Sequence, residues 1–371
     1  MAIDTDLEKV YYAVTQALHP EDIFGRDAHL GLPPEIVKER IGKTYESMYI
    51  IADPQRYRDV QDADFAQDAR DQLDHFLQIA YEKIENGEYG LVRAKKIFSL
   101  EKSFVVGGRK YYLGRKIFVG THFVFYEGYL EMEDGVGEVL IKLARDVSDN
   151  HLIQNEIRIL NTLHEVQVPQ WKHLPVIMNV FEAGRRHGMV FRKIVGVNLI
   201  DVRRDHLYKG GVDQRHMIWV LDRSLSALGY VHNQGVVHGD VCPQNIVIRP
   251  SNHNAFIVNW DRAIYKAAST GERLVAHQDV FRAPEAESGR VGPWSDLYSL
   301  GKVMIWLLGG DPETNTLPQD VARRVQRFLL HMVTEDISSR PHDAWELYGQ
   351  QVRLKDSLWE REFLHFEMSS S

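Results

Sequence analysis

An aspartate and an asparagine five residues apart, Asp240 and Asn245, form the pair whose types and spacing first suggest chemistry. They lie in a short polar stretch between two apolar runs typical of strands, so one loop can hold both side chains close together. On such a loop the carboxylate can accept the proton of a substrate hydroxyl, while the carboxamide oxygen can hold a metal ion. The alternative is a surface turn whose polar residues are incidental.

The residues around this pair, 236–248, include His238 two positions before Asp240. This order resembles the catalytic loop of the protein kinase-like superfamily, which has the form His-x-Asp-x-x-x-x-Asn. The resemblance implies that Asp240 is the catalytic base and that Asn245 holds metal. Further matches in the family's order favour this interpretation over an incidental turn.

Other parts of the family pattern occur on both sides of the loop. Lys142, in an apolar strand, resembles the lysine that contacts phosphate, and Glu156 resembles the helix residue that orients it. Such a lysine needs a counter-charge; the alternative for Lys142 alone is a solvated strand residue. Three further residues match positions that the family uses structurally: Glu285 in Phe281-Arg282-Ala283-Pro284-Glu285, Asp296 at the start of a helix, and Arg340, which would pair with Glu285.

The expected nucleotide-binding part departs from the family pattern. Of the Gly-rich loop before the lysine only Gly120 remains, and the bulky Phe118 and Phe123 suggest a loop that covers ATP poorly. Gly239 replaces an Arg that pairs with a phosphorylated activation loop, so we do not expect activation by loop phosphorylation. The nucleotide contacts that the resemblance implies are Gly120, Lys142, Arg192 and Ile194.

The largest departure is Asn259-Trp260-Asp261, in the position of the family's Asp-Phe-Gly. The family's Asp holds magnesium against the phosphates, whereas Asn259 offers a neutral oxygen, so magnesium affinity should fall. Two roles stay open for Asp261. In an extended strand it would lie on the same side as Asn259 and could bind metal with Asn245. Otherwise it takes the glycine position and points to solvent or caps a turn.

Three functions follow from these residues. The leading one is an ATP-binding, protein kinase-like protein whose Ser/Thr phosphotransfer is weak or lost, and the alternative is a pseudokinase scaffold that acts through protein contacts. Small-molecule phosphotransferases of the aminoglycoside and choline kinase type also resemble the His238-Gly239-Asp240 stretch. Glu285 with Arg340 favours a peptide-binding large lobe instead. ATP is the expected cofactor, while Asn259 counts against magnesium, and no His/Cys cluster has metal-ligand spacing.

A helical module is expected before these motifs, over residues 1–90. Apolar residues recur at helical spacing near 4–18, 34–54 and 73–84, with Pro20 ending the first helix, a polar loop at 59–68 and Gly87 ending the third. Fragments between Leu32 and Ile84 resemble the J-domain, a hairpin that stimulates the ATPase of seventy-kilodalton chaperones. Only Pro54 remains of its His-Pro-Asp tip. A generic three-helix cap is the alternative.

The motifs themselves are expected in a two-lobed domain over residues 98–350. Runs of β-branched and aromatic residues predict antiparallel strands near 104–106, 111–113, 117–126, 139–143, 176–181 and 189–194, with a helix at 151–163. Helical periods follow at 217–233, 297–308 and 321–332. The expected fold is α+β: a β-rich small lobe to about residue 195, a helical large lobe at 196–350, and a C-terminal helix and tail at 351–371.

Composition and charge limit the function further. The 371 residues are 44% hydrophobic and 26% charged, which is typical of globular proteins. The net charge is −8, and residues 1–90 carry nine basic and nineteen acidic side chains, so nucleic-acid binding is disfavoured. A single cysteine, no long apolar run and no signal peptide predict a cytoplasmic protein. We expect a protein substrate or partner, with residues 1–90 as a docking or dimerisation surface.

Overall fold

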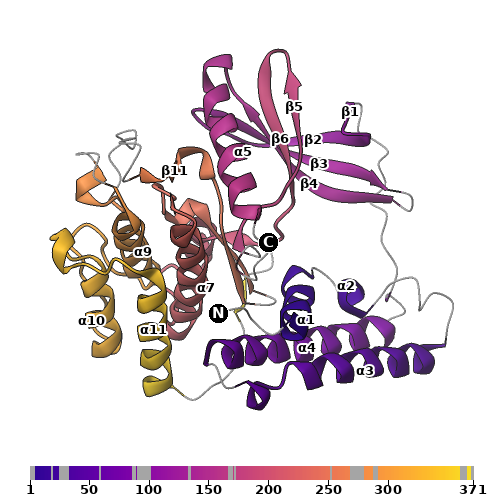
Figure 1. Cartoon of the computed structure of the whole chain (residues 1–371), viewed down its shortest axis with the longest axis horizontal. Helices are drawn as coiled ribbons and strands as arrows, with labels where there is room; N and C mark the ends of the chain where they lie inside the picture. Colours follow the sequence, from indigo (N-terminus) through magenta and orange to yellow (C-terminus); the bar gives the residue numbers. More distant parts are fainter. Residues whose placement is uncertain are drawn as a thin grey trace. The chain divides into compact units, whose positions relative to one another are not determined.

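The computed structural model divides the chain into two compact units, Met1–Lys95 and Lys96–Ser371. It describes residues 5–17, 20–24, 33–57, 60–85, 89, 102–132, 135–165, 170, 173–250, 253–267, 280–286, 291–359 and 366–368 (Figure 1). Each unit has hydrophobic clusters of its own. The fold is α+β, with a helical region before a domain that combines an antiparallel sheet with helices.

The described part of the first unit is helical. Its helices are α1 (Thr5–Gln16), α2 (Pro20–Phe24), α3 (Pro34–Ile51) and α4 (Val60–Glu85), with a 3₁₀ turn at Pro54–Arg56. Helix α1 ends before Pro20, and Pro20 itself begins α2, because proline suits a first turn. One expectation is wrong, because residues 60–68 of the predicted loop belong to α4. Phe65 explains this, since its ring packs 4.8 Å from that of Tyr11 on α1. Leu32 and Gly87 lie outside the described residues.

Helices α3 and α4 form an antiparallel hairpin. Lys38 near the start of α3 pairs with Glu85 at the end of α4, with 3.0 Å between Nζ and Oε1. At the other end Arg70 lies 3.4 Å from the carboxylate of Asp53, which also accepts the backbone N–H of Gln55. The hairpin therefore closes on itself at the tip. The resemblance to a J-domain stays a prediction.

A six-stranded antiparallel sheet forms the small lobe of the second unit (Figure 1). Its strands are β1 (Ser103–Val106), β2 (Arg109–Val119), β3 (Phe123–Met132), β4 (Gly135–Ala144), β5 (Ile177–Ala183) and β6 (Arg186–Arg192), in the order β1-β2-β3-β4-β6-β5. The predicted run over residues 117–126 is two strand ends joined by a tight turn, because the Gly120 N–H donates to the Phe123 carbonyl.

Strand β2 is longer than its neighbour β1. The pairing with β1 covers Arg109 to Tyr112, so the described residues give no strand partner on that side to residues 114–119. Three apolar side chains of this stretch are exposed: Ile117, Phe118 and Val119. Among the described residues, the last half of β2 is therefore an apolar strand edge without a partner.

Helix α5 (Asn150–His164) follows β4 and packs on the sheet (Figure 1). Ile153, Leu160 and Leu163 are fully buried at helical spacing, and they join the main core with residues of the large lobe. The helix expected at 151–163 is therefore present. Its buried face brings Glu156 inside the domain.

The large lobe is mainly helical. Its helices are α6 (Leu199–Arg204), α7 (Gln214–Asn233), α9 (Pro293–Leu307), α10 (Arg323–Met332) and α11 (Ala344–Leu358). Short strands form two small sheets, β7 (Val197–Asn198) with β9 (Ile246–Arg249) and β10 (Asn254–Ile257), and β8 (Val236–Val237) with β11 (Ile264–Tyr265). The three predicted helices are present, with ends shifted by a few residues.

The end of the described chain also packs on the large lobe. Phe366 is buried, and its ring stacks on Tyr208 with 4.7 Å between centroids. The predicted tail beyond Met368 lies outside the described residues. Among the helices that the structure describes, none is both long and apolar enough to cross a membrane.

Candidate functional site

Lys142 on β4 is fully buried beside two carboxylates. Its Nζ lies 2.6 Å from Glu156 Oε2 and 3.2 Å from Asp261 Oδ1. The expected ion pair with Glu156 is present, and the alternative of a solvated lysine is wrong. Burial acts to lower the Lys142 pKa, but the two carboxylates raise it above its usual value. Burial raises the pKa of Glu156, with Lys142 opposing this and Asp261 adding to it.

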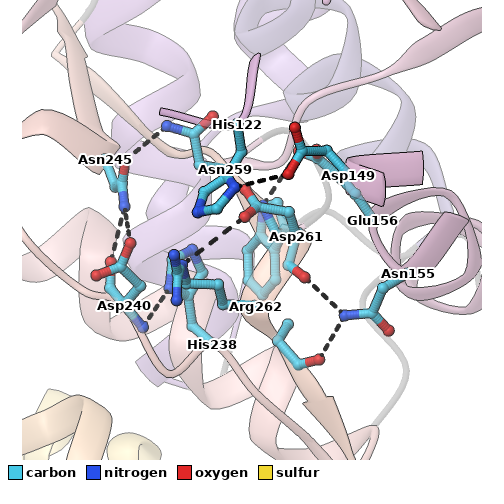
Figure 2. A network of polar contacts seen from close by, with 12 residues as sticks. His122, Asp149, Asn155, Glu156, His238, Asp240, Asn245, Asn259, Asp261 and Arg262 are labelled. Atoms are coloured by element: carbon cyan, nitrogen blue, oxygen red, sulfur yellow. Dashed lines mark hydrogen bonds and ion pairs between the residues drawn. The ribbon is translucent and has the colours of Figure 1, made fainter. Parts of the chain in front are cut away.

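Helix α5 holds the segment that contains the Asn-Trp-Asp motif. Glu156 Oε1 accepts the backbone N–H of Trp260 at 3.1 Å. The Asn155 side chain donates to the carbonyl oxygens of Asp261 and Ala263, both at 2.9 Å (Figure 2). The conformation of residues 260–263 is therefore tied to the position of α5.

The loop that carries Asp240 is anchored by Asp296 at the start of α9. Asp296 is buried, and its carboxylate accepts the backbone N–H groups of His238 and Gly239, each at 2.8 Å. Gly239 has a φ of +75°, a left-handed conformation that a side chain would strain, so glycine suits this position better than arginine. The Asn245 amide donates to the Asp240 carboxylate at 3.0 Å, which places the predicted pair side by side (Figure 2).

Asn259 and Asp261 face different partners. Asn259 has a φ of 64°, a conformation that asparagine tolerates better than most residues, and its amide donates to Asn245 Oδ1 at 2.6 Å. Residues 260–262 then form a 3₁₀ turn that directs Asp261 to Lys142. The extended geometry considered for Asp261 is wrong, because residues 260–262 form a turn. Pointing to solvent is wrong as well, because the side chain is buried. A role of Asp261 in capping the turn stays a prediction. Metal binding by Asp261 stays a prediction.

The turn between β2 and β3 stands in place of a Gly-rich loop. The Gly120 N–H donates to the Phe123 carbonyl at 2.8 Å, so this amide is already paired within the turn. The ring of Phe123 lies over the ammonium of Lys142, with 3.9 Å from Nζ to the ring centroid. Phe118 is 59% exposed, and its ring lies 6.3 Å from that of Phe125. Of the two bulky residues, Phe123 is the one that covers the site.

Arg192 and Ile194 lie where the sheet leads into the large lobe. Arg192 ends β6, its side chain is exposed, and its backbone N–H donates to the Val176 carbonyl at 3.0 Å. Ile194 is half-buried in the link that follows. Their contact with a nucleotide stays a prediction.

The predicted structural pair of the large lobe is present. Arg340 Nη1 lies 2.6 Å from Glu285 Oε1, and both side chains are buried. Ser295 Oγ donates to the same carboxylate oxygen at 2.8 Å. The Arg340 guanidinium also lies 4.5 Å from the ring centroid of Tyr298. This cluster fixes the segment at Glu285 against α9.

In this conformation the predicted metal ligands Asn245 and Asp261 are engaged in contacts within the protein. The Asn245 oxygen already accepts a hydrogen bond from Asn259, and the Asp261 carboxylate is held by Lys142. Magnesium prefers charged oxygen ligands, of which Asp240 is the one in contact with these amides. Within the described ranges, no group of three or more His, Cys, Asp or Glu side chains could hold a metal ion.

Comparison with known proteins agrees with this geometry. Residues 137–353, more than half of the chain, match the family described as the protein kinase domain. The chain belongs to the protein kinase domain family. Within this kinase domain the match begins in β4 and ends in α11, so it spans Lys142, the Asp240 loop and the Glu285–Arg340 pair.

Curated relatives of this kinase-domain protein bear the names of serine/threonine-protein kinases. A probable serine/threonine-protein kinase of Bifidobacterium longum is 26% identical over 216 residues, which cover 50% of this chain and 28% of the relative. Serine/threonine-protein kinase D of Synechocystis is 24% identical over 208 residues, covering 51% and 39%. PknB of Mycolicibacterium smegmatis is 32% identical over 190 residues, covering 46% and 29%. The chain therefore spans less than half the length of these relatives.

The sequence did not reveal three residues that shape the kinase site. Asn155 holds the Asn-Trp-Asp segment, and its place next to Glu156 on a helix was the available signal. His122 Nδ1 donates to Asp149 Oδ1 at 2.8 Å, which fastens the β2–β3 turn near the start of α5 (Figure 2). These two residues are 27 positions apart, and no local spacing links them.

Proposed function

We propose that the protein is a protein kinase-like, ATP-binding protein whose phosphotransfer to Ser/Thr side chains of proteins is weak or lost. The observation that carries this proposal is a pair of facing carboxamides. Asn259 donates to Asn245 Oδ1 at 2.6 Å, and Asn245 in turn donates to Asp240. Two neutral side chains thus stand where the family resemblance implies metal ligands.

Asp240 would accept the proton of the substrate hydroxyl in this proposal, and Asn245 would hold metal. Lys142 would contact phosphate, with Glu156 orienting it. The weak point is the missing charge at Asn259, because stabilising the transferring phosphoryl group is usually the largest catalytic contribution. Loss of one such group typically costs about 2.7–4 kcal/mol, or roughly a hundredfold to a thousandfold in rate.

The test compares phosphotransfer by the full chain and its variants. Asn259→Asp should raise activity, since it restores a carboxylate beside Asn245, and Asp240→Asn should abolish what remains. Transfer of labelled phosphate from ATP to a generic protein substrate, measured with and without magnesium, checks both. Asn198→Asp is the control for the added charge, because aspartate can also cap α6 there, although it loses the hydrogen bond that Asn198 donates to the exposed Asp201.

Two results would contradict the proposal. Robust wild-type activity that Asn259→Asp leaves unchanged would show that phosphotransfer does not need a carboxylate at position 259. If that activity were also lost in Asp261→Asn, Asp261 would be the metal ligand in place of Asn259. A response of the Asn198→Asp control equal to that of Asn259→Asp would show an effect of net charge alone.

A scaffold that acts through protein contacts is the second candidate. The complete burial of Lys142 under Phe123 favours it, because a nucleotide has no access to the ammonium in this conformation. A scaffold would keep its partner binding in the Asp240→Asn variant, whereas a kinase would lose its output. The names of the relatives support a protein as substrate or partner, and residues 1–90 are the proposed docking surface.

A further inference from the structure

The ammonium of Lys142 is enclosed on every side. A lysine has three N–H donors, and two carboxylates lie within reach, Glu156 Oε2 at 2.6 Å and Asp261 Oδ1 at 3.2 Å. The ring centroid of Phe123 lies 3.9 Å from Nζ, and that of Phe125 lies 5.6 Å away. The side chain of Lys142 is 0% exposed. The face that would meet a phosphate is therefore covered by an aromatic ring.

Phe123 belongs to the core of the domain, although it sits at the tip of a hairpin. It is the first residue of β3, directly after the turn, and it is 9% exposed. Its ring meets that of Phe125 edge-on, with 6.5 Å between centroids. An aromatic ring attracts a cation through its negative face. The Phe123 ring thus lies where a phosphate would contact the Lys142 ammonium, and it excludes water from the ammonium.

The hairpin tip is fastened to the segment between β4 and α5. The Arg145 backbone N–H donates to the His122 carbonyl at 2.7 Å, and its guanidinium donates to the Gly120 carbonyl at 3.1 Å. The His122 side chain donates to Asp149, whose second oxygen accepts the Asp146 N–H at 3.1 Å. The tip is therefore held from two sides, by its backbone and by a side chain.

We propose that Phe123 controls access of nucleotide phosphates to Lys142, and that the fastened turn 120–123 keeps the site closed until it lifts. This inference rests on the proposed function, because it concerns the same nucleotide site. The ligand is a nucleoside di- or triphosphate, whose terminal phosphate oxygens take the place of the ring beside the ammonium. Removing the ring opens that place without altering any of the three charged side chains.

The first experiment measures nucleotide affinity of the full chain by fluorescence titration with a ribose-labelled ADP. Phe123→Ala should bind about tenfold more tightly than the wild type, since the nucleotide no longer has to displace a ring from the cation. Phe118→Ala is the matched control: it removes the same ring from the same hairpin, but at an exposed position whose ring neighbours Phe125 instead of the ammonium. It should bind like the wild type.

A second measurement does not depend on nucleotide. Acylation of Lys142 by a small amine-reactive ester, followed by peptide mass spectrometry, reports how readily the reagent reaches the unprotonated amine of this side chain. The rate should rise in Phe123→Ala and in His122→Ala, which removes the side-chain attachment of the turn to Asp149, and stay at the wild-type value in Phe118→Ala. Phe123→Leu serves if Phe123→Ala does not fold, because it keeps most of the apolar volume without the aromatic face.

The outcomes separate this inference from the proposed function. A wild type that binds nucleotide as tightly as Phe123→Ala, or whose Lys142 is acylated as fast, overturns the role of Phe123 while leaving weak phosphotransfer in place. Robust phosphotransfer by the wild type overturns the proposed function instead. Tighter binding in both Phe123→Ala and Phe118→Ala would show a general loosening of the hairpin, and the specific role of Phe123 would be wrong.

Discussion

At the scale of single residues, the buried site is a cation shared by two carboxylates. Lys142 contacts both Glu156 and Asp261 where little water reaches. Removing Asp261 leaves a neutral pair, which is a common buried arrangement. Removing Lys142 leaves two carboxylates facing each other without a counter-charge, and a stranded buried charge is far more costly than a lost contact. The cation is therefore the member on which the cluster depends.

We predict that Lys142→Met lowers the free energy of unfolding by about 3–5 kcal/mol, and that Asp261→Asn lowers it less. All seven tryptophans lie between residues 171 and 359, so tryptophan fluorescence during urea unfolding reports on the second unit alone. Equal losses in the two variants would mean that Asp261 is as necessary as the lysine, and would contradict the ranking.

At the scale of elements, helix α5 acts as the common support of the site. Its residues Asn155 and Glu156 hold the Asn-Trp-Asp segment, and Asp149 just before it holds the β2–β3 turn. The turn and the segment have no sequence proximity, yet both take their positions from the same helix. A shift of α5 would therefore move the β2–β3 turn, which carries Phe123, together with the carboxylates of Glu156 and Asp261.

In the large lobe, helices α7 and α11 pack closely at Gly229 and Trp345. A Cβ atom at Gly229 would lie 2.7–2.8 Å from three atoms of the Trp345 indole, which is a rigid ring. Gly229→Ala should therefore destabilise the second unit by about 1–3 kcal/mol, as overpacked cores do. The measurement is again urea unfolding followed by tryptophan fluorescence.

Gly349→Ala provides the control for this contact on the helix that carries Trp345. A Cβ atom there meets only the end of the Arg353 side chain, at 3.5 Å. We expect a gain of about 0.5–1 kcal/mol from replacing a helical glycine. A loss in Gly349→Ala as large as that in Gly229→Ala would show that α11 does not tolerate substitution in general, and the packing argument would be wrong.

The sequence predicted the elements better than the way they meet. Periodic apolar residues located α5 and the strands, and the spacing of Asp240 and Asn245 placed them side by side. The contact of Asp261 with Lys142 was not predicted, because it depends on one left-handed residue, Asn259, followed by a 3₁₀ turn. The position of the Phe123 ring over Lys142 was not predicted for a similar reason. Whether a phenylalanine at a turn points inward is decided by contacts such as His122 with Asp149, which are distant in sequence.

At the scale of the whole molecule, charge is divided unevenly between the two units. Residues 1–90 carry the excess of acidic side chains, and the rest is close to neutral. The tip of the α3–α4 hairpin also differs from the His-Pro-Asp tip of a J-domain. Pro54 is flanked by Asp53 and Gln55, and the Asp53 carboxylate is held by Arg70. A chaperone that binds a J-domain through a basic helix and an accessible His-Pro-Asp tip does not match this unit.

We predict that residues 1–95 do not stimulate the ATPase of a seventy-kilodalton chaperone. This segment forms a compact unit with its own cores, so it is suitable for testing alone. The measurement is steady-state ATP hydrolysis by the chaperone with increasing amounts of the segment, with an authentic J-domain as positive control. Stimulation that disappears in Pro54→Ala would contradict the prediction and establish a working J-domain.

The open half of β2 bears on how the protein behaves when it is concentrated. In the part of the chain that the structure describes, residues 114–119 have no strand partner on one side, and Ile117, Phe118 and Val119 are exposed. Such an edge is a template on which strands of other molecules can grow. The neighbouring Lys116 opposes such self-association by like-charge repulsion, whereas the charge of Arg115 is paired with Glu127. Because salt screens that repulsion, with a Debye length of about 8 Å at physiological ionic strength, colloidal stability should be best in dilute buffer and should decline as salt is added.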